Sequence, residues 1–163
     1  MAGVKLEVGK GIDNYIRALD KLTLGAEPQI KQAVYVGGGI VADAIREAIK
    51  GLAKREGKFK DPPVTGVTNS QREGLLEGLG ISRMQNDSGY INVHIGFDGY
   101  NSTVTDNWPR GVPNVLVARS LESGTSWLKK SPFIDPTVRS VQVKAEMAMA
   151  AAFDRAISKD FGG

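Results

Sequence analysis

A long run of amphipathic helical spacing, starting at Glu27-Pro28, constrains this chain more than any other feature. Apolar residues recur at intervals of three or four from Ile30 to Leu52, and charged residues fall largely on the other side. Proline is tolerated in a first helical turn, so Pro28 suits the start of this helix. An amphipathic helix is stable when another layer covers its apolar side, so the rest of the chain has to supply that layer.

A second long helix is expected near the C-terminus. Asp135 can cap it, with Pro136 at its first position. The spacing of three to four residues then continues along one stripe through Val138, Val141, Ala145, Ala148, Ala152 and Ala156. Met147 and Met149 flank this stripe, and methionines at such spacing are usually core residues that fill gaps.

The first long helix contains an interruption, Gly37-Gly38-Gly39. Each glycine costs about 1 kcal/mol relative to alanine in a helix interior, so something should offset that cost. Close packing against the alanines of the C-terminal helix is one explanation, and a kink or hinge is the other. We favour packing, because breaks in helices have identifiable causes.

Short strands and helices are expected between the two long helices and before them. Residues 4–8 alternate as a strand, residues 13–22 predict a helix, and residues 70–79 predict another. Residues 81–84 and 90–97 alternate around Asn86-Asp87-Ser88-Gly89, which predicts a β-hairpin. Its second strand places Ile91, Val93, Ile95 and Phe97 on one face and His94 on the other. The order predicts an α+β fold, in which a small antiparallel sheet (N-terminal strand plus hairpin) packs against two long helices, with long loops.

Residues 113–136 predict a corner between two helices. Pro113 opens a short helix that ends at Gly124, and residues 131–136 form a turn that starts the last helix. The residues that shape this structural corner are Glu122, Gly124, Pro132 and Phe133. Beside it, an aromatic residue, Trp127, stands next to the basic pair Lys129 and Lys130. The stretch contains no pair of nucleophile and base, which indicates an assembly protein rather than an enzyme.

Two loops carry further candidate interface residues. The loop at 57–70 contains Lys58, Lys60, Pro62, Pro63 and Thr65, and its basic residues continue a run that includes Lys50, Lys54 and Arg55. A solvated helix end is the favoured interpretation of this run, and contact with an acidic partner or nucleic acid is the alternative. The loop at 98–113 contains Trp108-Pro109-Arg110. This tryptophan either plugs the edge of the core or anchors a partner.

Composition limits the remaining functions. The 163 residues carry a net charge of +3, too little by itself to indicate nucleic-acid binding, and suit one domain over residues 1–163. The chain has no cysteine, and its apolar runs are too short to span a bilayer. Because no Walker A, HExxH, calcium-loop or GxSxG pattern occurs, we expect no catalytic residue, no metal and no cofactor. Two alternatives remain: a basic nucleic-acid-binding module, and a small hydrolase using His94 with Asp87 or Asp98, which we disfavour because no convergent site is visible.

Four short motifs together resemble a known family. They are Pro62–Gly66, Gly96–Asn101, Ala118–Ser126 and Pro132–Pro136, and with the helices around them they span residues from about 29 to the C-terminus. In this order they resemble the tail-completion or head–tail joining minor structural proteins of lambdoid long-tailed bacteriophages (gene-product-ten-like). After Gly66 the chain departs from the family's pattern, which continues with leucine and serine into a strand.

The resemblance implies a non-enzymatic virion protein of the phage neck that is assembled in the host cytoplasm. It implies that the chain forms a homo-oligomeric ring, expected to be a hexamer. The expected partners are head-completion or connector proteins on one side and the tail terminator or tail tube protein on the other, with DNA in the ring lumen as a further contact. No membrane contact is expected. The loops around Trp108 and around residues 57–70 are the expected contact segments, since such loops can order on binding.

Overall fold

The computed structural model describes residues 3–6, 26–55 and 63–161. The helix expected at 13–22 lies outside these residues. The elements in chain order are β1 (Gly3–Leu6), α2 (Glu27–Lys50), α3 (Asn69–Gly78), β2 (Leu79–Ile81), β3 (Gln85–Asp87), β4 (Tyr90–Phe97), α4 (Asn114–Ser123) and α5 (Asp135–Phe161).

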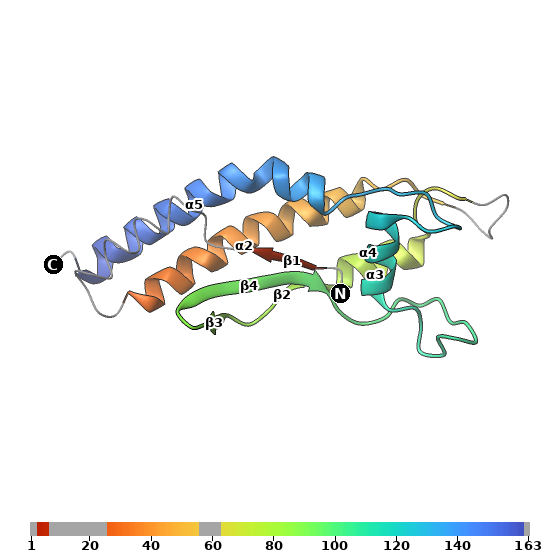
Figure 1. The fold of residues 1–163 in the computed structure, drawn as a ribbon, viewed down its shortest axis with the longest axis horizontal. Coiled ribbons are helices and arrows are strands. Elements are labelled where there is room, and N and C mark those ends of the chain that lie inside the picture. Colours follow the sequence, from red (N-terminus) through yellow and green to blue (C-terminus); the bar gives the residue numbers. More distant parts are fainter. Residues whose placement is uncertain (1–2, 7–25, 56–62, 162–163) are drawn as a thin grey trace.

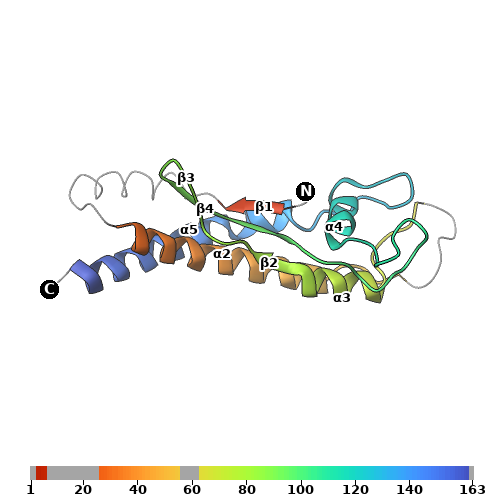
Figure 2. The same cartoon turned by 90° about the horizontal axis from the view of Figure 1, so that it is seen from below.

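The fold is α+β, as the sequence predicts, with a small antiparallel sheet packed against helices. The two long helices, α2 and α5, run antiparallel along the length of the molecule (Figure 1). The start of α2 meets the end of α5, where Gln29 Nε2 donates to Asp160 Oδ2 at 2.7 Å. The sheet has the order β1-β4-β2, with β3 also paired to β4. Figure 2 shows the sheet lying along one side of the helix pair.

Two clusters of buried side chains form the core. The first surrounds the second half of α2 and brings together α3, α4, the end of the sheet and the start of α5, with Ile45 and Leu121 at its centre. The second surrounds the first half of α2 and joins Val34, Val93 and Phe153. The half-buried side chain of Ile81 packs against both clusters, so the core continues along the whole helix pair.

The glycines of α2 do not break it, since the helix continues from Glu27 to Lys50. Gly37 and Gly38 are buried within this unbroken helix, which favours packing over a hinge. Gly39 differs, because a Cβ atom built there would have no neighbour within 4 Å. Two of the three glycines are therefore buried, and the third has open space for a side chain.

The first strand of the predicted hairpin is wrong at residues 82–84. Strand β2 ends at Ile81, which pairs with Ile95, while β3 starts at Gln85, which pairs with Asn92. Between these two pairs the β2–β3 side advances four residues, from Ile81 to Gln85, whereas β4 advances three, from Asn92 to Ile95. The β2–β3 side therefore contains one extra residue. This is a β-bulge, and it interrupts the ladder because one residue has no opposite partner.

The turn of the hairpin is also shorter than predicted. Asp87 already pairs with Tyr90, which leaves Ser88 and Gly89 as a two-residue turn. Both have positive φ, 56° and 91°, as a type I′ turn requires. Strand β4 spans the predicted residues, and Ile91, Val93 and Ile95 of its predicted inner face are buried. Phe97 of that face is half-buried, and Asn92 on the opposite face is fully buried.

The start of α5 differs from the prediction in its cap. Asp135 lies inside the first turn and forms an ion pair with Arg139 at 3.0 Å. The carboxylate of Glu122, from the end of α4, accepts hydrogen bonds from the backbone N–H groups of Phe133 (2.5 Å) and Ile134 (2.6 Å). Its other oxygen accepts from the N–H group of Asp135 at 3.4 Å, so Glu122 and not Asp135 supplies the side-chain acceptor at the start of α5.

The core role expected for both methionines of α5 holds for one of them. Met149 is buried, whereas Met147 is 68% exposed. The two residues are separated by two positions, which turns their side chains to opposite sides of a helix. Met147 was therefore wrongly placed in the core.

A tryptophan-lined groove as the candidate functional site

Three loops meet at the end of the molecule opposite to the end of α5 (Figure 1). Backbone hydrogen bonds tie the loop after residue 63 to the loop after α4: Val64 N–H donates to Trp127 O and Lys129 N–H donates to Val64 O, both at 2.8 Å. The hydroxyls of Ser70 and Ser102, 2.6 Å apart, join the loop at 98–113 to α3. These contacts make the loops one continuous surface.

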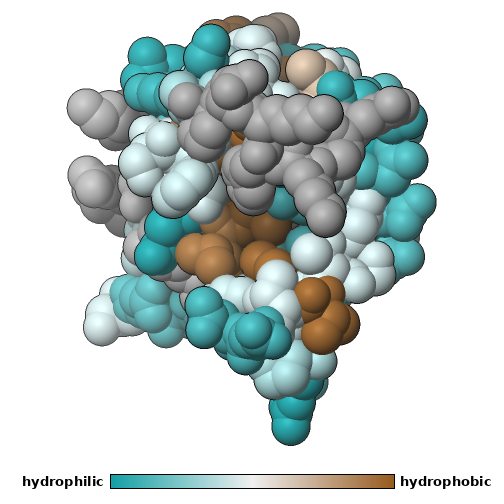
Figure 3. All heavy atoms as spheres, turned by 90° about the vertical axis from the view of Figure 1, so that its right-hand side faces the viewer, coloured by the Kyte–Doolittle hydropathy of each residue, from teal (hydrophilic) through white to brown (hydrophobic). Residues whose placement is uncertain are grey.

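A groove opens on this surface with a volume of about 630 Å³. Its lining residues are Arg55, Gln71, Asn107, Trp108, Val112, Leu116, Val117, Ser120, Thr125, Trp127 and Leu128. Seen from this end, the molecule shows a hydrophobic hollow with hydrophilic residues around it (Figure 3). Val117 belongs to the first core cluster, so the floor of the groove is an opening onto the core.

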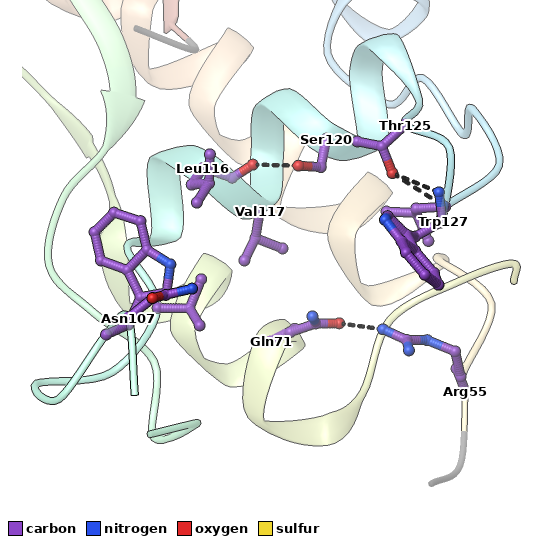
Figure 4. A pocket seen from close by; sticks show the side chains of 11 residues that line it. Arg55, Gln71, Asn107, Leu116, Val117, Ser120, Thr125 and Trp127 are labelled. Atoms are coloured by element: carbon purple, nitrogen blue, oxygen red, sulfur yellow. Dashed lines mark hydrogen bonds between the residues drawn. The ribbon is translucent and has the colours of Figure 1, made fainter. Parts of the chain in front are cut away.

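The groove has two long sides and two ends (Figure 4). Leu116 and Val117 of α4 line one side, Gln71 and Arg55 lie along the other, and Asn107 and Trp127 stand at opposite ends. Ser120 Oγ donates to Leu116 O at 2.8 Å and so keeps its polar atom within α4. The α4 side is therefore apolar and the Arg55 side is polar.

Both tryptophans of the chain line this groove, although 19 positions separate them. Trp108 is 40% exposed and Trp127 is 59% exposed. Short local bonds hold them: Trp108 N–H donates to Thr105 O at 2.9 Å, and Trp127 N–H donates to Thr125 Oγ1 at 3.2 Å. Of the two roles open for Trp108, its exposure within the groove fits the anchoring role better than that of a buried plug.

The polar side depends on Arg55. Its Nη2 donates to Gln71 Oε1 at 3.1 Å, and the same Gln71 oxygen accepts from Thr68 N at 3.0 Å in the capping box that starts α3. Partial burial lowers the pKa of the Arg55 guanidinium from its usual value, because desolvation disfavours the charged form. The groove therefore contains a half-buried cation hydrogen-bonded to a neutral amide.

The close approach of α3 and α4 determines the walls of the groove. A Cβ atom at Gly74 would lie 2.2 Å from Asn114 Oδ1, so only glycine fits there. Asn114 is buried, and its Nδ2 donates to Asp98 O at 2.8 Å. This contact between α3 and α4 was not predicted from the sequence. The available signal was the pair Gly74 and Gly78, one helical turn apart on the same face of α3.

The expected interface residues that the structure describes all lie exposed at the groove end. They are Pro63, Thr65, Trp108, Arg110, Trp127, Lys129 and Lys130. Lys58, Lys60 and Pro62 lie outside the described residues.

The corner residues have structural contacts. Gly124 ends α4 with φ of 73°, which favours glycine. Phe133 is buried with its ring centroid 6.0 Å from that of Phe97, and Pro132 is exposed beside it.

The residues behind the two alternatives have other contacts. In the basic run, Lys50 Nζ lies 2.7 Å from Glu47 Oε1, and Arg55 is held by Gln71. For the hydrolase alternative, Asp87 Oδ2 accepts from Asn92 Nδ2 at 2.9 Å, and Asp98 Oδ1 accepts from Gly99 N at 2.9 Å. Both carboxylates thus accept hydrogen bonds from residues close to them in the chain.

Across the described ranges, no three His, Asp or Glu side chains come together as a metal ion would require. None of the helices in that part of the chain combines the length and apolarity needed to cross a bilayer. No protein-family model, curated protein or solved structure matches this chain.

Proposed function

We propose that this protein is a non-enzymatic structural subunit of the neck of a tailed bacteriophage, where it joins the head connector to the tail as part of a ring. The four motifs that resemble tail-completion proteins motivate this proposal. The single observation that carries it is the groove: an apolar hollow holding two exposed tryptophans at the end of the molecule.

The physical basis is that interfaces depend on a few aromatic anchors in apolar pockets. Trp108 and Trp127 leave apolar ring surface in water, and covering that surface is favourable. The exposed cations Arg110, Lys129 and Lys130 supply a polar rim around such a centre. A groove of this kind suits binding of a protein segment.

The test is assembly in solution. The purified protein, alone and mixed with the head-side connector and tail tube proteins of the same virus, is examined by negative-stain electron microscopy and mass photometry. We expect closed rings, with six subunits, in at least one of these mixtures. Monomers under every condition would overturn the proposal.

A tryptophan variant links assembly to the groove. We expect Trp127→Ala to weaken ring formation by about 30-fold or more, as truncation of an aromatic anchor does. Tyr35→Ala is the matched control, because Tyr35 is an aromatic residue of α2 that is 45% exposed and does not line the groove. Equal assembly of both variants would separate ring formation from the groove.

Binding to nucleic acid is measured in the same preparations. If Lys50, Lys54 and the following lysines contact DNA, affinity for a duplex must fall steeply as salt rises. Strong, salt-sensitive binding by the monomer without any ring would favour the nucleic-acid-binding module over the neck subunit.

A further inference from the structure

Helix α5 is apolar on two opposite sides. Its inner side packs in the core through Ala145, Met149, Ala152, Phe153 and Ala156. Its outer side carries Val143 and Met147, which are 67% and 68% exposed, followed by the exposed Ala150 and Ala151. These last four residues are called the outer stripe of α5.

The outer stripe has the spacing of a helix that docks into a groove. Its members are separated by four, three and one positions, so they share one face of the helix. Helices bound in apolar grooves are recognised by anchors at this i, i+4, i+7 spacing. A surface helix of a lone subunit is usually polar on its outer side, so the stripe indicates a contact.

We infer that the outer stripe of α5 in one copy docks into the tryptophan-lined groove of the next copy. This inference rests on the proposed ring and names the contact that builds it. Within one copy the two surfaces cannot meet, because α5 leads away from the groove end along the molecule (Figure 1). A contact between two different surfaces is heterologous, and heterologous contacts close into rings when the rotation allows.

Charge supports this occupant. Asp154 continues the outer stripe one turn beyond Ala150 and is exposed. The groove presents cations in return: half-buried Arg55 on one side, and exposed Lys129 and Lys130 beyond Trp127. Lys144 lies at the other end of the stripe, and exposed Arg155 lies one position further round α5 than Asp154. The carboxylate of Asp154 is therefore the group expected to lie toward Arg55 and the lysines.

Site-directed disulfides test the contact directly, because the natural chain contains no cysteine. Met147→Cys protein is mixed with Asn107→Cys protein, whose substitution lies at one end of the groove, and the mixture is oxidised. We expect a disulfide-linked dimer of the two variants in at least tenfold excess over the control. The control mixture pairs Asn107→Cys with Gln32→Cys, an exposed position on α2.

Two outcomes would overturn the inference. One is cross-linking no greater than in the control mixture. The other is a predominance of Met147→Cys linked to itself, which would show that two α5 helices pair with each other. Either result can occur while rings form normally, so it leaves the proposed function standing. Cross-links without rings would instead support the contact and remove the neck ring.

A charge variant gives a second measurement. Met147→Glu places a carboxylate in the outer stripe, and we expect it to weaken association by about 10- to 100-fold. Met147→Leu keeps the apolar side chain and should associate like the natural protein. Because Met147 is exposed, both variants should keep the natural melting temperature. Unchanged association of Met147→Glu would contradict the docking of α5.

Discussion

Glu122 connects two helices that the chain separates by a loop. Its carboxylate accepts the backbone N–H groups of the two residues that lead into α5, Phe133 and Ile134, and more weakly that of Asp135 at 3.4 Å, while its own backbone belongs to the last turn of α4. The N–H groups at a helix start have no partner within the helix, and a negative charge there is favourable. One side chain therefore both satisfies α5 and holds the corner.

Replacing Glu122 should destabilise the fold in proportion to what is removed. We expect Glu122→Ala to lower the free energy of unfolding by about 1–2 kcal/mol, since it removes the acceptor for buried donors. Glu122→Gln keeps an oxygen acceptor and removes the charge, so its effect should be smaller. Urea unfolding measures both, and an alanine variant as stable as the natural protein would show that the cap is unimportant.

The sequence located this corner but not its contacts. Glu122, Gly124, Pro132 and Phe133 were recognised because helix stops and prolines leave local signals. The sequence predicts Asp135 as the cap, because a local pattern identifies only capping residues that are adjacent to the helix in the chain. Capping by Glu122 comes from tertiary structure, which no local pattern reports.

At the scale of elements, α2 carries glycines of two kinds. Gly37 and Gly38 are buried, whereas a side chain at Gly39 would have open space around it. A glycine inside a helix makes the unfolded chain more flexible and so lowers the free energy of unfolding. Only a close contact that excludes a side chain compensates for this loss. A residue with a higher helix propensity at position 39 should therefore make the protein more stable.

We expect Gly39→Ala to raise the free energy of unfolding by about 0.5–1 kcal/mol, which is roughly 1–4 °C in melting temperature. Gly66→Ala is the contrasting variant. Gly66 has φ of 88°, and a Cβ atom there would lie 2.2 Å from Ala53 O, so this change should destabilise. Thermal unfolding followed by circular dichroism measures both. A loss of stability in Gly39→Ala would mean that Gly39 is needed for packing.

Elements with strong periodicity were predicted well. The long helices and α4 follow from apolar spacing with prolines and helix stops, and β4 follows from alternation. Residues 82–84 were not predicted, because a bulge depends on the partner strand: Ser82 Oγ accepts the N–H of His94 at 2.9 Å, across the sheet. Alternation within one strand contains no information about that partner.

At the scale of the whole molecule, the two core clusters share α2 and are bridged by Ile81. A helix that crosses both clusters cannot lose its packing in one and keep it unchanged in the other. The described part of the chain is therefore expected to unfold in one cooperative step.

Core truncations on either side test this cooperativity. We expect Leu121→Ala in the first cluster to cost about 2–5 kcal/mol and Phe153→Ala in the second about 3–5 kcal/mol, through lost burial and cavities. Each should lower a single transition seen alike by near- and far-ultraviolet circular dichroism. Two separate transitions in either variant would show that the clusters unfold independently.

The groove was the least predictable feature. Both tryptophans were singled out, but their meeting depends on three loops and on the approach of α3 to α4 through Gly74 and Asn114. Such a site is made of segments far apart in the chain, so their spacing in the sequence says nothing about their distance in space. The fold class could be inferred from the sequence, whereas the shape of the site required coordinates.

The last turn of α4, which also lines one side of the groove, binds through Glu122 the backbone just before α5. In the proposed ring, a subunit held at its groove would therefore have the direction of its longest helix set by this corner. A small change of tilt at the groove would then move the C-terminal end of α5 by a larger distance. Around a closed circle the tilts between neighbours must add up to one full revolution. If the protein forms the proposed ring, Glu122, through the angle between α4 and α5, would then help to determine the number of subunits.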